Sequence, residues 1–306
     1  MRLLCFFTIL FLCSCSSTNT KQTQYAHKPS TVSANSAFTL KLPSGLGVPY
    51  HGEINFDQGA QNSASFLYPA PNLVGFLAAI ATHAAIVDSV NNGKKTDLQT
   101  NADKILVPYK SVVSGFSYDM LKEQSLIKIS QNNQKIGTAI PSAEVDSWTL
   151  ESVPVYIFSQ DQKTLTLQNS VTVYFSNKST AIVYQNLIKI ISDPIFEKNP
   201  VEYWTQNEGE KLKNLSAELL AQSLKIATEE ASKDPDIDVA TYKTFHYYRG
   251  ESEQIERGQL IANSCNRIVI RNLRGWIMSV PSHSSSSAAL PNSCTDDQIA
   301  KAATAQ

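Results

Sequence analysis

Apolar and polar residues alternate along residues 165–175, where most odd positions carry leucine, valine or phenylalanine and most even positions carry threonine, serine or glutamine. This period of two predicts a β-strand with one buried face and one wet face. Residues 153–158 before it and 181–191 after it are rich in β-branched and aromatic residues, and short polar breaks at 161–162 and 177–178 suit hairpin turns. The pattern predicts a three-stranded antiparallel meander.

Two helical regions are predicted before this meander. Residues 73–87 form a charge-free run between Pro71-Asn72 and Asn92-Gly93, which are helix start and stop signals. Because the run is apolar all round, it predicts a buried helix of about 23 Å, shorter than a bilayer core, with a membrane helix as the alternative. A second helical region is expected over 97–126, with a break near Pro108.

After the meander, Thr205-Gln206-Asn207-Glu208 resembles a capping box, and a leucine stripe over 212–224 predicts an amphipathic helix. Further strands are expected over 242–249, 259–262 and 267–273. The predicted fold is therefore α+β, with an antiparallel sheet, made of the meander and C-terminal strands, packed against the buried apolar helix and the amphipathic helix.

The N-terminus has the features of a secretory signal. Arg2 supplies a positive charge, residues 3–12 are apolar and uncharged, and a small residue, Ser14, precedes Cys15. Ten apolar residues span about 15 Å as a helix, which is half of a hydrocarbon core, so this run does not predict a membrane-spanning anchor.

The end of this signal, Leu12-Cys13-Ser14-Cys15, resembles the lipobox of bacterial lipoproteins. The resemblance implies that the Cys15 thiol takes a diacylglycerol, that the peptide is cut before Cys15, and that the new amine is acylated. Ser16 after the cysteine implies forwarding to the outer membrane, on its periplasmic face. Modification of Cys13, which would place the large Leu12 at the cut, and an ordinary secreted protein with a chance cysteine are the alternatives.

The composition argues against two classes of protein. The chain has 306 residues, 26 Lys+Arg against 27 Asp+Glu, and 42% hydrophobic residues. This near-zero net charge argues against a nucleic-acid partner, which would require a basic excess, and the hydrophobic content argues against a disordered chain. We therefore expect a signal peptide at 1–14, a lipidated Cys15 with a flexible polar tether over 15–40, a globular domain over 41–281 and a loose Ser/Ala-rich tail over 282–306.

Within the globular domain, residues 41–145 are expected to form a helical part and residues 146–281 a sheet part. The mature chain would keep Cys265 and Cys294, and an oxidising compartment favours a disulfide between them, with two unrelated thiols as the alternative. Closing this loop would contribute about 3–4 kcal/mol on the chain-entropy model. No histidine lies at ligand spacing from either cysteine, so neither a metal site nor a cofactor is predicted.

The arginines are unevenly distributed. The last five, Arg249, Arg257, Arg267, Arg271 and Arg274, fall within 26 residues of one another. Because arginine pairs well with carboxylate and phosphate, Arg267, Arg271 and Arg274 are candidates for an anion-binding strip that would contact lipid headgroups, lipopolysaccharide phosphates or an acidic partner. The alternative is cross-strand pairing with nearby glutamates, which are Glu251, Glu253 and Glu256.

Signals for catalysis are weak. The chain has no G-x-S-x-G elbow, P-loop, dinucleotide fingerprint or H-E-x-x-H motif. His83 lies in the apolar run, and His246 stands among Phe245, Tyr247 and Tyr248, where core packing is favoured over sugar stacking. His51-Gly52-Glu53 matches only the first half of a zinc-deaminase signature.

Three functions are compatible with these features. The first is a lipid-anchored, non-enzymatic component of the cell envelope that binds an envelope protein. The second is a lipid- or glycan-binding module with an apolar cavity between the apolar helix and the sheet. The third is an envelope hydrolase whose motif is not apparent. A deep apolar pocket would favour the second over the first, and a filled core with an exposed apolar patch would favour the first over the second.

Overall fold

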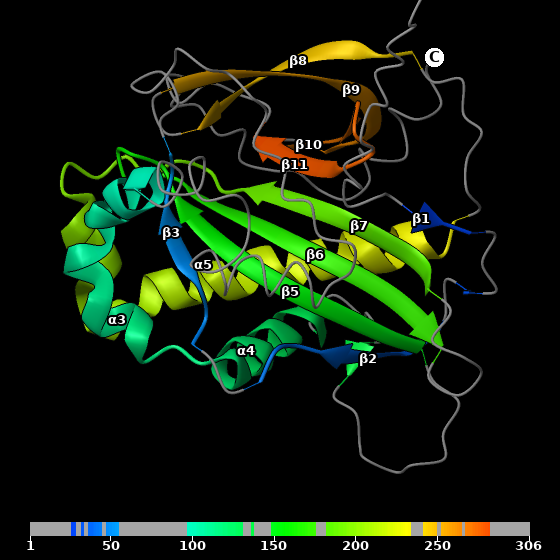
Figure 1. Ribbon diagram of the computed structural model, residues 1–306, viewed down its shortest axis with the longest axis horizontal. Helices are drawn as coiled ribbons and strands as arrows, with labels where there is room; N and C mark the ends of the chain where they lie inside the picture. The colour runs from blue at the N-terminus through cyan, green and yellow to red at the C-terminus, as the bar shows by residue number, and fades with distance from the viewer. Residues whose placement is uncertain are drawn as a thin grey trace, which may run out of the picture.

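The computed structural model describes residues 26–28, 32–33, 36–44, 47–54, 97–130, 136–137, 148–175, 182–233, 241–249, 252–264 and 267–281. In these ranges, eleven strands form one sheet with the order β4-β2-β5-β6-β7-β11-β10-β9-β8, to which β1 adds beside β7 and β3 beside β5 (Figure 1). The strands are β1 (Ala26–His27), β2 (Phe38–Lys41), β3 (Tyr50–Gly52), β4 (Ile136–Gly137), β5 (Trp148–Phe158), β6 (Leu165–Phe175), β7 (Ile182–Ile191), β8 (Lys243–Arg249), β9 (Ser252–Ser264), β10 (Arg267–Asn272) and β11 (Ile277–Pro281).

The predicted meander is confirmed in the centre of the sheet. β5 pairs with β6 from Trp148↔Phe175 to Phe158↔Leu165, and β6 pairs antiparallel with β7. The turn between β5 and β6 places Gln162 at a φ of 59° and holds it through its N–H, which donates to the Ser159 carbonyl at 2.8 Å. The predicted wet face is wrong, because the strands of the meander are buried on both faces: in β6 the polar positions Thr166, Ser170 and Thr172 are only 2–4% exposed.

The prediction of an antiparallel sheet is correct only in part, because the sheet is mixed. β2 and β3 both run parallel to β5, β4 runs parallel to β2, and β11 runs parallel to β7. Parallel neighbours need crossover connections, and here helices occupy the chain between β3 and β5 and between β7 and β11. The first crossover carries residues 97–102 in helical conformation, then η1 (Asp103–Tyr109), α3 (Lys110–Ser114) and α4 (Tyr118–Ser130). Pro108 lies inside the 3₁₀ segment η1, where the sequence predicted a break.

The second crossover begins with α5 (Pro200–Ala231), whose start differs from the prediction. Asn199 caps the helix, since its side-chain oxygen accepts from the Glu202 N–H at 3.3 Å. The predicted capping box over 205–208 falls instead on a break, where 206–209 have non-helical dihedral angles. Gly209 is left-handed with a φ of 77°, and a side chain there would overlap Val112 of α3. The left-handed glycine therefore lets the chain pass close to α3 at the break.

α5 covers one face of the meander and closes the main hydrophobic core. Side chains from the strands and from α5 are fully or almost fully buried there, among them Trp204, Tyr156, Leu167, Leu220 and Leu224. Neutral hydrogen bonds cross this core. The Tyr156 hydroxyl donates to the Ser216 carbonyl at 2.7 Å, and the Asn169 amide donates to the Ser223 hydroxyl at 2.9 Å.

The C-terminal strands β8 to β11 build a second, smaller layer, which Figure 1 shows on the far side of the meander from α4. Its core contains Ile191 of β7 together with Tyr247, Ile270, Met278 and Val280, all of them buried. β9 pairs with β8 over residues 252–258 and with β10 over residues 258–264, where the register shifts between Val269 and Ile270. A side chain at Gly258 would collide with the Arg271 carbonyl, so β9 and β10 approach closely there.

Part of the segment predicted as a tether belongs to the sheet. β1 pairs with β7, and β2 places the buried Phe38 and Leu40 beside β5. These strands have two and four residues and are too short to show a period in the sequence. Their pairing with β7 and β5 places them in the sheet. The predicted signal peptide (1–14), Cys15, the helix over 73–87 and the tail (282–306) lie outside the described residues. In the described ranges, no helix combines the length and apolar character needed to cross a bilayer.

Candidate functional site

The candidate site is a histidine–aspartate pair where β3 meets η1. His51 Nδ1 lies 3.2 Å from Asp103 Oδ2, and the Gly52 N–H donates to Asp103 Oδ1 at 2.8 Å. The Gln99 amide donates to the same Asp103 oxygen at 2.7 Å and to the Gly52 carbonyl at 3.1 Å. A strand, a helical turn and a 3₁₀ helix therefore meet on one carboxylate.

Hydrogen bonds and the neighbouring His51 favour the ionised form of Asp103. Burial alone would raise the pKa of this carboxyl, but hydrogen bonds from His51, Gly52 and Gln99 and the charge of His51 outweigh it and leave the pKa below its usual value. Gly52 makes the approach possible, because a side chain at this position would overlap the Ala102 carbonyl.

An ion pair lies directly beyond this pair on the chain. Glu53 binds Arg249 of β8, and its backbone carbonyl accepts from the Gln160 amide. Burial lowers the pKa of Arg249 to about 10, a value at which the guanidinium stays charged at neutral pH. The candidate site is thus connected to the C-terminal layer.

The contact with Asp103 holds the His51 imidazole in one orientation. A carboxylate at Nδ1 leaves Nε2 for a proton, a metal ion or a hydrogen-bond partner, and the His51 side chain keeps 27% of its surface exposed. Among the described residues no hydroxyl or thiol bonds to His51, and no three His, Cys, Asp or Glu side chains in these ranges are grouped to hold a metal ion. The contacts of Asp103 with His51 and Gly52 hold β3 against η1.

His51 stands out in the sequence as part of a half motif, whereas no sequence signal indicates Asp103. The two residues are 52 positions apart, so no local spacing signals their contact. The Gly after His51 is the one clue, because glycine within a strand often marks a close backbone approach.

The predicted arginine strip consists of side chains with different surroundings. Arg267 Nε donates to the Ser279 hydroxyl at 3.1 Å, its Nη2 donates to the carbonyls of Ile191 and Ser279, and its Nη1 lies 3.4 Å from Asp193. Burial lowers the pKa of this guanidinium, while Asp193 and Glu218 oppose the shift. Arg267 therefore joins β10 to β11 and to the end of β7.

Arg271 reaches α5 rather than the solvent. Its Nη2 donates to Glu230 Oε2 at 2.7 Å, and Lys233 donates to the other oxygen at 2.7 Å. The Glu230 side chain is only 3% exposed, so two cations neutralise a buried carboxylate. Arg274 is exposed and lies over the Trp276 ring, with its guanidinium carbon 5.0 Å from the ring centroid.

The carboxylates that pair with these arginines are not the expected ones. Arg249, Arg267 and Arg271 bind Glu53, Asp193 and Glu230, which come from the body of the protein. Of the three glutamates considered from the sequence, Glu253 pairs with His246 at 2.9 Å and Glu251 lies outside the described residues. The pairing is thus between layers rather than across neighbouring strands.

The remaining predicted positions divide as follows. Cys15, Cys265, Cys294 and His83 lie outside the described residues, so the lipidation and the disulfide stay predictions. His246 and the aromatic residues around it separate by strand alternation. Tyr247 points into the small core, where it is 4% exposed, while His246 faces outward.

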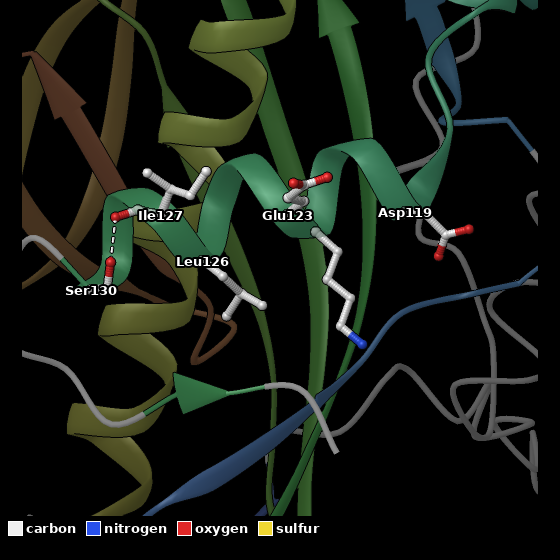
Figure 2. A pocket seen from close by; sticks show the side chains of 6 residues that line it. Asp119, Glu123, Leu126, Ile127 and Ser130 are labelled. Atoms are coloured by element: carbon white, nitrogen blue, oxygen red, sulfur yellow. Dashed lines mark hydrogen bonds between the residues drawn. The ribbon is translucent and has the colours of Figure 1, made fainter. Parts of the chain in front are cut away.

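The surface of α4 carries a shallow open hollow of about 520 Å³ with apolar side chains at its centre. Figure 2 shows Asp119, Glu123, Leu126, Ile127 and Ser130 spaced along this helix, with the Ser130 hydroxyl donating to the Ile127 carbonyl at 2.8 Å. Ile127 is 53% exposed, so part of this face is apolar and open to solvent.

Comparison with protein-family models, with curated proteins and with solved structures finds no match for this chain.

Proposed function

We propose that this chain is a lipoprotein of the bacterial outer membrane that faces the periplasm and works as a non-enzymatic component binding other envelope components. The observation that carries the proposal is the N-terminal sequence, in which an uncharged apolar run ends at Leu12-Cys13-Ser14-Cys15. Several acyl chains on Cys15 would give a lasting anchor, because one chain alone binds a bilayer only marginally.

The binding role is supported by the way the described residues pack. Side chains fill the space between α5 and the meander, where Leu150, Leu167, Val171 and Leu220 are 0% exposed. Large apolar side chains stand on the outside instead, on η1, α4 and the C-terminal layer: Val107, Met120, Ile127, Ile255, Leu260 and Leu273. These exposed side chains are available for contact with another envelope component.

The anchor is tested by metabolic labelling with an alkyne fatty acid in cells that produce the full chain. We expect the chain to take up the label and to fractionate with the outer membrane. Cys15→Ser should abolish the label and release the protein, because the thiol proposed to take the diacylglycerol is then absent.

Cys13→Ser is the matched control, since it removes a neighbouring thiol and leaves the cut site unchanged. It should keep both the label and the membrane location. Label retained in Cys15→Ser and lost in Cys13→Ser would move the anchor to Cys13. Absence of label from the unmodified chain would contradict the proposal.

A further inference from the structure

The turn between β10 and β11 presents an apolar and a cationic side chain to solvent. Leu273 is 63% exposed, Arg274 is exposed, and Trp276 is partly buried. The Arg274 guanidinium lies over the Trp276 ring, and within the described ranges no carboxylate forms an ion pair with it. We call residues 272–276 the β10–β11 turn.

Hydrogen bonds fix the shape of this turn. The Asn272 side-chain oxygen accepts from the N–H groups of Arg274 at 3.0 Å and Trp276 at 3.1 Å. The Gly275 N–H donates to the Asn272 carbonyl at 2.9 Å, and Gly275 has a φ of 79°, a conformation that favours glycine. Because the turn is already ordered, its exposed side chains can bind a partner at little further cost in conformational entropy.

The β10–β11 turn lies beside the point where the chain enters the described part of the sheet. Ala26 of β1 pairs with Gln185 of β7, and the amide of the next residue, Asn186, donates to the Gly275 carbonyl at 3.1 Å. β6 occupies the other edge of β7, so β1 and β11 follow one another along the same edge (Figure 1).

The proposed lipid anchor limits how far this entry point can lie from the bilayer. Ala26 is eleven positions after Cys15, and eleven residues span at most about 40 Å when fully extended. The ten residues of β7 alone span about 33 Å. The anchor therefore keeps the elements beside Ala26 nearer to the bilayer than those at the opposite end of β7.

We propose that the β10–β11 turn docks on the phospholipid surface that holds the Cys15 lipid. Leu273 enters the boundary between headgroups and acyl chains, Arg274 pairs with a lipid phosphate, and Trp276 lies at the interface, where tryptophan is favoured. The inference rests on the proposed lipid anchor. It adds a second contact, which sets the side of the domain that faces the bilayer.

A protein partner is the less favoured occupant of this turn. Stable protein interfaces bury about 1,000 Å² or more, and a five-residue turn is too small to supply that area alone. A bilayer requires no matching shape. Because the anchor already holds the turn close to the lipid, a weak second contact is enough to keep it there.

The experiment replaces Leu273 by a photo-reactive amino acid in the full chain, in cells that are fed the alkyne fatty acid and radioactive phosphate. The diacylglycerol on Cys15 contains no phosphate, so phosphate that joins the chain only after irradiation reports a phospholipid adduct. We expect this adduct. The same photo-reactive residue at Phe196 is the control, because Phe196 is 75% exposed but follows the opposite end of β7. It should give little adduct.

The role of charge is tested in the chain that carries the photo-reactive residue. Arg274→Glu should lower the phospholipid adduct about tenfold, because a carboxylate repels lipid phosphates, and Arg274→Lys should retain most of it. Lys225→Glu makes the same reversal at an exposed position of α5 and should leave the adduct unchanged. All three variants should melt within a few degrees of the parent, because both positions are exposed. Equal losses from the two reversals would reduce the effect to net charge and overturn the assignment of Arg274.

The outcomes separate the inference from the proposed function. A chain that carries the fatty-acid label but gives no phosphate adduct at Leu273, equal adducts at Leu273 and Phe196, or an adduct to a protein instead overturns the docking and leaves the anchor standing. A chain without the label overturns the proposed function. In that case purified chain and vesicles of radioactive phosphatidylglycerol and phosphatidylethanolamine decide: an adduct at Leu273 and not at Phe196 supports the docking, and any other result overturns it.

Discussion

α5 and the β8–β11 strands are held to the meander by different interactions. α5 packs through large aliphatic and aromatic side chains, and the hydrogen bonds that cross this core are neutral. The β8–β11 strands continue the sheet beyond β7, have a small apolar core of five buried residues, and are joined to the body by arginine–carboxylate pairs.

This difference accounts for the uneven arginine distribution. Arg249, Arg267 and Arg271 each connect a strand of the C-terminal layer to a carboxylate of the body. A small apolar core contributes little burial, and arginine can add several directed hydrogen bonds at a layer boundary. On α5 apolar burial dominates, and its one buried carboxylate, Glu230, is where Arg271 of the C-terminal layer reaches the helix.

The largest effect is expected from Trp204→Ala on the α5 side. Trp204 is 1% exposed, and its indole N–H donates to the Gln162 carbonyl at 2.8 Å. Its removal should lower the free energy of unfolding by about 3–5 kcal/mol, measured by urea denaturation. Trp276→Ala in the C-terminal layer is the control, with a smaller expected loss because Trp276 is only partly buried. Equal losses would break the contrast between the layers.

Glu230→Ala should have the next largest effect, because it leaves Arg271 without its carboxylate partner at a partly buried position. We expect a loss of about 3 kcal/mol in the free energy of unfolding. Hydrogen exchange should quicken most in β10 and its neighbours, since the pair connects this strand to α5.

The neighbouring Glu229 provides the matched control. It is 52% exposed and pairs with Lys225 at 4.0 Å, so Glu229→Ala should cost less than about 1 kcal/mol. Faster exchange spread evenly over both layers of the Glu230 variant would show that the carboxylate supports the whole fold rather than one junction.

The contrast between layers also explains what could be predicted from the sequence. The meander was predictable because alternation is local and each hairpin joins neighbouring strands. The parallel pairings of β2, β3 and β11 were not, because they join segments far apart in the chain. The first half of β9 is rich in charged residues and shows no apolar alternation. Only residues 259–262 of Ser252–Ser264 were therefore expected as a strand.

The candidate site residues divide in the same way, into those that a local sequence pattern indicates and those that only distant contacts reveal. The amphipathic stripe identified the buried leucines of α5, and the clustering of arginines was visible at once. Their partners Glu53, Asp193 and Glu230 lie 41 or more positions away, beyond the reach of any local pattern. The contact of His51 with Asp103 was hidden for the same reason.

Asp103→Asn should have a moderate, pH-dependent effect. The pKa of Asp103 is lower in the folded protein than its unfolded value of about 3.9, so ionisation of this group stabilises the fold above that pH. This contribution is lost as the pH falls through the lowered pKa. At neutral pH we expect the variant to lose about 1 kcal/mol, measured by denaturant titration.

The difference between parent and variant should shrink as the pH falls through the lowered pKa of Asp103, because the parent carboxyl is then also protonated. Asp119→Asn on the exposed face of α4 is the control, because it makes the same change at an exposed position and should cost less at neutral pH. A constant difference at all pH values would mean that the introduced amide fails through its shape rather than through its lack of charge.

Arg274→Ala should change stability least, because the side chain is exposed and its contact with the Trp276 ring contributes about 0.5–1 kcal/mol at such a site. Of the three arginines predicted to bind anions, it is the one whose guanidinium faces solvent, whereas Arg267 and Arg271 bond to groups of the protein itself.

If anionic envelope material contacts this region, Arg274→Ala should weaken sedimentation with anionic vesicles by about fivefold, the effect of one basic residue near a charged surface. Lys225→Ala on α5 is the control, because Lys225 is also exposed but lies in the other layer. Equal weakening by both variants would reduce the effect to net charge and remove any special role of the C-terminal layer, whereas a loss confined to Arg274 would give that layer a binding role beyond its docking onto the meander.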